Sequence, residues 1–237
     1  MKKISMILAA CLMVCSLASA QKKPLDHSVY DGWQTVSGTV LTDDGQFMAY
    51  LISPQQGDAE LVITNTVTGQ ELKVERGGAA TFSKDGKWAV FNIKAPYAAT
   101  RQAKIDKKKG DDMPKDSLGL VDLNTFELKK IADVSASKST LRKNNFVAYQ
   151  TEWKKEVPDT VKKAPKAEKI TVVMNLATGR TDTLKNVSKY GFDEFGTKLA
   201  VVFAKDKKDS LTRNEVALYT LSDMSRKTLS SDLGFYS

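Results

Sequence analysis

The sequence predicts an all-β chain built from four copies of one four-stranded unit. A tight turn followed by an alternating strand lies at residues 42–50 and again at 83–91, with weaker copies at 142–149 and 193–201. Each copy is followed by a second hairpin, and these second hairpins turn at Thr68-Gly69, Asn124-Thr125, Thr178-Gly179 and Asp223-Met224. A four-stranded unit that repeats at about 40–50 residues is typical of a β-propeller blade. A β-sandwich also contains short strands and turns, but the internal order that the four units share favours the propeller.

The first turn of each unit has its own chemistry. Asp44-Gly45 and Asp85-Gly86 suit a tight hairpin because Gly adopts positive φ and Asp tolerates it. Asn144-Asn145 replaces Asp-Gly in the third unit, and Asn is the next best residue at positive φ. The Ser or Thr two places before the Asp can bond its hydroxyl to the turn backbone, which would fix the loop locally.

The four units predict blades at about residues 37–76, 77–132, 138–185 and 188–230. Their sixteen strands are expected near residues 37–41, 47–52, 61–65 and 70–75; 79–82, 87–93, 118–122 and 127–131; 139–141, 146–151, 170–175 and 181–184; and 190–192, 199–204, 216–220 and 225–229. Residues 230–237 resemble the start of a fifth unit. We therefore expect residues 37–237 to form an incomplete or open propeller, because a closed ring needs its last blade beside its first.

Residues 1–20 have the pattern of an export signal. Lys2 and Lys3 precede an apolar run, and the small residues 18–20 form a cleavage site before Gln21. The run is too short for a membrane span, so we expect a periplasmic or extracellular protein without one. Residues 8–11 also fit a lipoprotein signal, in which Cys11 would be lipidated. Both cysteines lie in this segment, so the exported chain would have no disulfide.

A lead-in segment, residues 21–36, precedes the first unit. It contains His27, the single histidine of the chain. As a catalytic base or a metal ligand His27 would have no visible partner, so a surface or capping role is favoured. Val29, Tyr30 and Trp33 can share one side of a short helical turn in this segment.

Charged insertions interrupt the second and third units between their second and third strands. Residues 95–117 and 152–169 each contain six basic and four acidic residues. The excess of basic residues in these insertions allows a basic surface for an acidic partner or a nucleic acid, and the whole chain has a net formal charge of +8. Mixed signs and few aromatic residues argue against nucleic acid, which favours stacking and a continuous positive groove. Solvated, extended loops are therefore expected, and both would emerge on the same face of a propeller.

The sequence predicts no catalytic, cofactor-binding or metal-binding residue. A serine or cysteine hydrolase needs a nucleophile beside a histidine base, and the chain has no G-x-S-x-G and a lone histidine. A zinc site needs clustered His, Cys or carboxylates, and no P-loop or dinucleotide fingerprint is present. We therefore expect no cofactor and leave open whether the chain belongs to an enzyme.

Two segments resemble one known family. Residues 23–33, KPLDHSVYDGW, and residues 100–118, TRQAKIDKKKGDDMPKDSL, are similar to exported prolyl oligopeptidase-family serine peptidases of the Bacteroidetes type. The resemblance extends over residues 21–237. It implies an N-terminal propeller that gates the access of peptides to a C-terminal α/β-hydrolase domain. This chain departs from the pattern, since it contains no hydrolase motif onto which a catalytic residue could be carried.

The resemblance implies the non-catalytic propeller segment of a secreted peptidase. Its partners would be the hydrolase domain of the full-length parent and peptide substrates. The alternative is a free-standing periplasmic propeller that binds a protein or a glycan, similar to the propeller of TolB. Substrate specificity, the blade number of the parent and the oligomeric state are not encoded in any motif of the chain.

Overall fold

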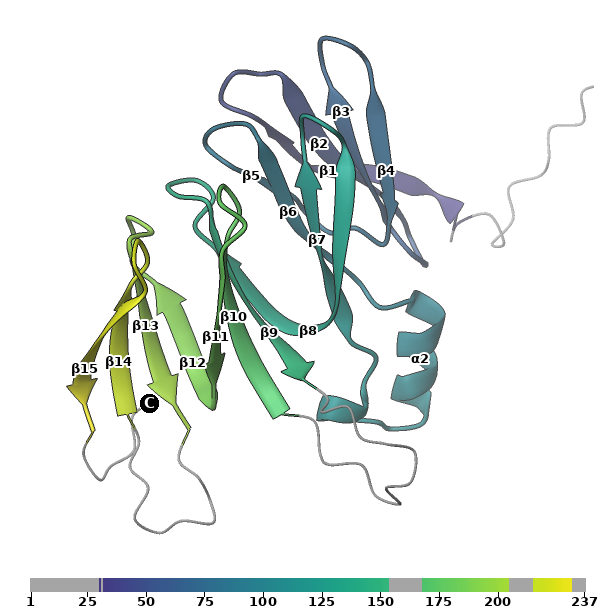
Figure 1. Cartoon of the computed structure of the whole chain (residues 1–237). Helices are drawn as coiled ribbons and strands as arrows, with labels where there is room; N and C mark the ends of the chain where they lie inside the picture. Colours follow the sequence, from purple (N-terminus) through teal and green to yellow (C-terminus); the bar gives the residue numbers. More distant parts are fainter. Residues whose placement is uncertain (1–29, 31, 154–167, 205–214, 232–237) are drawn as a thin grey trace, which may run out of the picture.

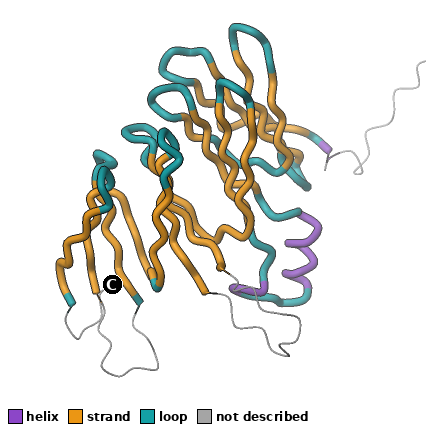
Figure 2. Tube along the Cα trace, viewed as in Figure 1, coloured by secondary structure: helices purple, strands orange, loops and turns teal. Residues whose placement is uncertain are grey.

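The chain folds into three antiparallel sheets that follow one another along an open arc, which Figure 1 shows in a computed structural model of the protein. The structure describes residues 30, 32–153, 168–204 and 215–231. The expected export signal, the lipidation of Cys11, His27 and most of the 152–169 insertion lie outside the described residues. Strands dominate the described chain, and Figure 2 shows that helix is confined to short segments.

Each sheet keeps sequence order, so within a sheet every strand pairs with the strands that precede and follow it in the chain. The first sheet contains β1 (Gln34–Leu41), β2 (Phe47–Pro54), β3 (Glu60–Asn65) and β4 (Glu71–Glu75). The second contains β5 (Thr81–Phe82), β6 (Trp88–Ile93), β7 (Asp116–Asp122), β8 (Glu127–Ser139), β9 (Phe146–Trp153), β10 (Glu168–Asn175) and β11 (Thr181–Lys185). The third contains β12 (Val187–Phe192), β13 (Lys198–Phe203), β14 (Glu215–Thr220) and β15 (Ser225–Ser230).

These sheets are four propeller blades. Blade 1 is β1–β4 and blade 4 is β12–β15, while the seven-stranded sheet holds blade 2 (β5–β8) and blade 3 (β8–β11). No pairing between described strands joins blade 4 to blade 1, and the two blades lie at opposite ends of the arc in Figure 1. The all-β fold and the open propeller expected from the sequence are therefore confirmed.

Strand β8 departs from the prediction. Separate strands were expected near residues 127–131 and 139–141, but β8 is continuous and serves two blades. Its first half pairs with β7 and its second half, from Val134, pairs with β9. The strand changes partner next to Asp133, which has φ 56°. The expected strand at residues 139–141 is wrong because Thr140 and Leu141 begin the following turn.

The 95–117 insertion also differs from the extended loop that was expected. It folds into helix α2 (Tyr97–Ile105) and the 3₁₀ turn η2 (Gly110–Asp112). The helix packs Ala103 inward, where 4% of that residue is exposed. The Asp58 carboxylate accepts a hydrogen bond from Tyr97 N at 2.8 Å, so the helix start is fixed to the β2–β3 connection. None of the described helices is long and apolar enough to cross a membrane.

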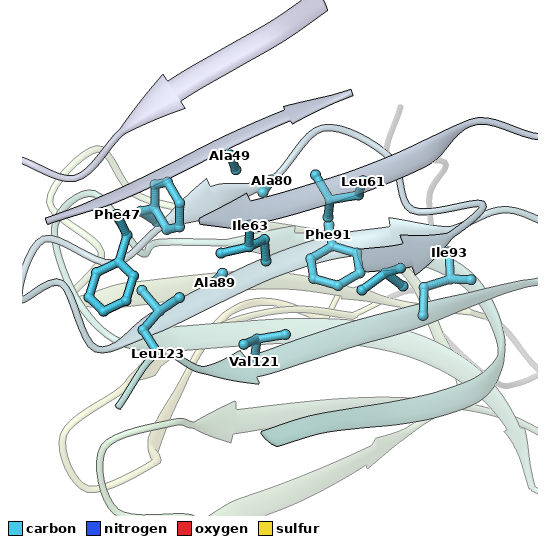
Figure 3. Packing of buried hydrophobic residues seen from close by; sticks show 12 residues of the cluster. Phe47, Ala49, Leu61, Ile63, Ala80, Ala89, Phe91, Ile93, Val121 and Leu123 are labelled. Atoms are coloured by element: carbon cyan, nitrogen blue, oxygen red, sulfur yellow. The ribbon is translucent and has the colours of Figure 1, made fainter. Parts of the chain in front are cut away.

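The hydrophobic core is divided into three layers, one between each pair of adjacent blades. Figure 3 shows the layer between blades 1 and 2, where Leu61 and Ile63 of β3 face Phe91 of β6 and Val121 of β7. The second layer lies between blades 2 and 3, and the third between blades 3 and 4. Complete burial of such a side chain is worth about 1.5–3 kcal/mol. Blade-to-blade packing therefore holds the arc together.

Candidate functional site

The turns between the first and second strands of the blades converge on one face of the arc. A buried hydroxyl organises two of these turns. Ser83 Oγ donates to Asp85 Oδ1 at 2.5 Å and accepts from Trp88 N at 2.9 Å. Thr42 Oγ1 likewise donates to Asp44 Oδ1 at 2.6 Å. The local fixing of the turn that the sequence predicted is thus confirmed.

The third and fourth turns are fixed by other side-chain contacts than the first two. Thr140 Oγ1 accepts from Phe146 N across six residues, one more than the five that separate Ser83 from Trp88. In this longer turn neither Asn144 nor Asn145 is among the described residues with positive φ. The expectation that Asn144 and Asn145 replace Asp-Gly at positive φ is wrong. The turn contains one extra residue and closes without positive φ at either asparagine.

The fourth turn uses a carboxylate in place of the hydroxyl. Asp193 Oδ1 accepts from Thr197 N and from Lys198 N, both at 2.7 Å. Gly196 follows at φ 66°, and a Cβ there would lie 2.8 Å from Thr140 Cβ. Only glycine fits this position without a shift of the neighbouring turn.

Polar contacts link the turns of different blades. Asn145 Nδ2 donates to Asp85 Oδ2 at 3.0 Å, between blades 3 and 2. Asn144 Nδ2 donates to Gly196 O at 2.9 Å, between blades 3 and 4. An ion pair joins Arg142 Nη1 to Asp43 Oδ1 at 3.4 Å and so connects blade 3 to blade 1. The turn face is therefore braced across all four blades.

Burial and hydrogen bonds act in opposite directions on the pKa of Asp85. Burial alone would raise it, but the hydrogen bonds from Ser83, Asn145 and the Lys87 backbone, together with the Lys87 charge, outweigh burial and hold the pKa below its ordinary value of 3.8. Asp85 is thus a carboxylate that accepts hydrogen bonds, which is a structural role.

A hollow of about 470 Å³ opens beside these turns, where blades 2, 3 and 4 meet. One wall is cationic, with Lys138, Arg142 and Lys143 of blade 3, and the other carries Asp193 and Glu194 of blade 4. Arg142 and Lys143 are exposed. Charges of both signs therefore line the same space.

Lys138 shapes the floor of this hollow. Its Nζ donates to Tyr190 O at 2.8 Å and lies 5.5 Å from the centre of the Tyr190 ring. Tyr190 belongs to β12, which has no partner on its other edge among the described strands. Lys138 therefore occupies a carbonyl that an exposed sheet edge would otherwise offer to another strand. Burial raises the pKa of the Tyr190 phenol to about 12.

The opposite face of the arc carries helix α2. A second hollow, of about 440 Å³, lies there between blades 1 and 2. Its lining includes Asp58, Arg76, Lys94, Tyr97 and Asp116. Asp116 anchors the base of the insertion, since its carboxylate accepts from Lys94 Nζ at 2.8 Å and from Ala95 N at 3.0 Å.

An ion pair connects this face to blade 3. Lys115 Nζ contacts Glu152 Oε1, and each side chain is less than one-fifth exposed. The insertion of blade 2 is thus held to blade 1 through Asp58 and to blade 3 through Glu152. Insertion residues form an ordered part of this face.

No nucleophile–histidine pair or metal-ligand cluster occurs in the described ranges 32–153, 168–204 and 215–231. The sequence predicted no site residue, and the two hollows are visible only in the folded structure. A weak signal existed at residues 138–143, KSTLRK, where three basic residues surround a turn. The acidic residues Asp193 and Glu194 lie at least fifty residues further along the chain, and no local motif connects the two walls.

Neither a family model nor a curated protein sequence matches the chain. Among solved structures, it is similar to the acylaminoacyl peptidase of Pyrococcus horikoshii, with 12% identity and a TM-score of 0.47 over 90% of this chain and 35% of that one. It is also similar to the β-propeller domain of the Trilobed protease of Pyrococcus furiosus, with 12% identity and a TM-score of 0.46 over 86% and 60% of the two chains. TolB of Acinetobacter baumannii has 16% identity and a TM-score of 0.38 over 84% and 44%. The chain spans about a third of the length of the acylaminoacyl peptidase.

Proposed function

We propose that this chain is the propeller portion of an exported prolyl oligopeptidase-like peptidase, in which it controls the access of peptides to a hydrolase domain. One observation carries the proposal. Residues 100–118, which together with residues 23–33 most specifically resemble that family, belong largely to an ordered insertion that has defined contacts on one face of the blades. A solvated loop would have no such contacts.

The anchoring of this insertion supports a docking role. Asp58 holds the start of α2, Asp116 holds the return of the chain, and Lys115 pairs with Glu152 of blade 3. Most of α2 remains exposed, including Tyr97 and Ile105, which are 37% and 56% exposed. A rigid support that presents exposed apolar side chains suits contact with a second domain.

Access would be controlled by shape. The blades are joined by three buried layers and by the braced turns, so the arc resists bending. A hydrolase nucleophile behind such a wall would be reached by short, flexible peptides and not by folded proteins. The chain itself would supply no step of the peptide cleavage.

The first test is to sequence the coding DNA beyond codon 237. The proposal expects an open frame that encodes further blades and a G-x-S-x-G hydrolase domain. A stop codon there would overturn it and would favour the free-standing propeller that binds a protein or a glycan.

The second test uses the full-length protein that such a frame encodes. Cleavage of a tetrapeptide amide is compared with cleavage of the same sequence within a folded protein. Tyr97→Ser with Ile105→Ser should lower this selectivity, while Arg101→Ser, an exposed change on the same helix, serves as the matched control. Unchanged selectivity in the double variant would contradict a docking role for α2.

A further inference from the structure

Lys138 brings an ammonium group that no carboxylate neutralises into the hollow where blades 2, 3 and 4 meet. Its Nζ donates to Tyr190 O at 2.8 Å and lies 5.5 Å from the centre of the Tyr190 ring. Both partners are uncharged, and Lys138 forms no ion pair with any described residue. Since an ammonium group carries three donors, two of them are available to a ligand. Lys138 is exposed, so a ligand from solvent can reach it.

The two contacts fix the Lys138 ammonium beside the backbone of β12. A Cβ on Gly191 would lie 3.9 Å from Lys138 Nζ, and the glycine leaves this space open. A lysine that is already held in place loses less conformational freedom when it binds an anion. The ammonium is therefore a preorganised cation at the edge of blade 4.

Hydrogen-bond donors without protein partners lie in the same hollow as this cation. Thr81 and Ser139 line the hollow together with Lys138, and neither hydroxyl has a hydrogen-bond partner in the described part of the chain. The same three residues line an adjoining hollow of about 170 Å³ between blades 2 and 3. No acidic side chain of the described residues lines that smaller hollow. The two spaces thus share one cation and two hydroxyls.

The acidic residues of the larger hollow leave the cation unpaired. Asp193 is engaged within its own turn, where Oδ1 accepts from two backbone N–H groups and Oδ2 accepts from a threonine hydroxyl at 2.8 Å. Glu194 is exposed and forms no ion pair within the described ranges. On the other wall, Arg142 forms an ion pair with blade 1, and Lys143 is exposed without such a pair. Lys138 and Lys143 are therefore the cations that an anionic ligand can use.

We propose that this hollow binds the carboxylate of a ligand, with Lys138 as its counter-ion and the hydroxyls of Thr81 and Ser139 as further donors. An ionised carboxylate only accepts hydrogen bonds, and it has about four lone-pair sites for them. Bonds from an ammonium group to a carboxylate are charge-assisted and about twice as strong as neutral ones. The hollow of about 470 Å³ lies in the range of about 300–1,000 Å³ that is usual for small-molecule sites. It therefore has room for the end of a short peptide.

Two sources of ligand share this chemistry, namely the C-terminus of a short peptide and a small organic acid. A peptide source rests on the function proposed above, because the chain would then handle peptides on their way to a hydrolase domain. The carboxylate site itself rests on the residues of blades 2, 3 and 4 alone. The test therefore compares both kinds of ligand.

The experiment is a titration of the isotope-labelled chain, followed by the NMR signals of its backbone amides. The probes are N-acetyl-trialanine with a free C-terminus, the same peptide as its C-terminal amide, and propionate. We expect the free acid to shift the signals of Thr81, Ser139 and Gly191 with a dissociation constant of about 1 mM or below, and the amide to leave them unchanged. Tighter binding of the peptide acid than of propionate supports a peptide source. Equal binding of the two keeps the carboxylate site but contradicts its use for peptides, and equal binding of acid and amide, or no shift with either acid, would overturn the proposal.

Substitutions on the two walls test the role of each charge. Lys138→Met should weaken binding of the peptide acid about tenfold, because it removes a charge-assisted hydrogen bond. Lys130→Met is the matched control, since Lys130 is an exposed lysine of the same strand that lines neither hollow.

Two further variants keep the test independent of the folding of Lys138→Met, and circular dichroism checks the strands of each. Thr81→Val should weaken binding about threefold through the loss of one neutral hydrogen bond. Glu194→Gln should tighten binding, because it removes a negative charge from the opposite wall. Unchanged binding in a folded Lys138→Met variant, or weaker binding in Glu194→Gln, would contradict the recognition of a carboxylate by this cation.

Discussion

Replacement of Ser83 by Ala tests how much the buried turn hydroxyl contributes to the stability of the blades. Ser83 is 1% exposed. Its Oγ donates to Asp85 and accepts from the backbone N–H groups of Lys87 and Trp88. Asp85 Oδ1 also accepts from Lys87 N at 3.3 Å, so Trp88 N is the donor left without a partner. The change therefore removes three hydrogen bonds and leaves the Trp88 N–H without an acceptor.

The magnitude follows from these contacts. A net hydrogen bond is worth about 1 kcal/mol, and a buried donor left without a partner costs about 1–3 kcal/mol. We expect Ser83→Ala to lower the free energy of unfolding by about 2 kcal/mol. For a chain of this size that corresponds to about 4–8 °C in Tm.

Thermal unfolding followed by circular dichroism measures this shift. Ser83→Thr is the conservative control, because Thr42 and Thr140 hold the same position in neighbouring turns. Ser188→Ala is the matched surface control, since its exposed hydroxyl makes one bond, to Val202 O. A Ser83→Ala variant that melts within about 1 °C of the wild type would refute the role assigned to the buried hydroxyl.

Three further changes have defined outcomes. Burial raises the pKa of Tyr190 from 10.0 to about 12, so the stability from its neutral phenol is present below pH 10 and is lost as the pH rises toward 12; Tyr190→Phe should reduce the loss in urea unfolding between pH 9 and pH 11. Thr64 Oγ1 is the buried side-chain atom without a hydrogen-bond partner among the described residues, so Thr64→Val should raise the unfolding free energy by about 1 kcal/mol in the same assay, and a loss would contradict the unpaired state. A Cβ on Gly119 would lie 2.4 Å from Phe91 Cε2, so Gly119→Ala should cost about 1–3 kcal/mol through overpacking, and an unchanged Tm would show that the ring moves freely.

The strands were predictable because their signals are local. Alternating apolar residues and short turns occur within each hairpin, and the second hairpins turn as expected. Gly69 and Gly179 have positive φ at their turns, and Phe126 and Met224 take the same conformation without being glycine. In these two turns the blade geometry overrides the residue preference.

The departures have non-local causes. Strand β8 continues from blade 2 into blade 3 because β7 and β9 each pair with half of it, and neither partner is visible in the local sequence. Helix α2 carries no acidic residue in its first turn, and its N-cap residue, Pro96, makes no side-chain hydrogen bond, so these local start signals are missing. Its position depends on Asp58, thirty-nine residues earlier.

The candidate hollow was unpredictable for the same reason. Lys138 and Tyr190 meet across two blades, and the cationic and acidic walls belong to turns of different repeats. A repeat pattern predicts where turns lie, but it does not tell which turns become neighbours once the blades fan out. A charged turn residue therefore predicts a binding hollow only when the packing order of the blades is known.

The two faces of the arc differ in how they are built, and this difference bears on function. On the turn face, short loops of similar length contact one another, and the Arg142–Asp43 pair spans blades 3 and 1. A change in length there would break contacts in several blades at once. On the opposite face, the β6–β7 connection contains helix α2, and the β6–β7 ladder stays regular, while the β7–β8 ladder shifts register between Asp116 and Leu118, where the insertion ends. Stability therefore constrains the length of the loops on the turn face, while the insertion face accommodates a longer connection between two paired strands.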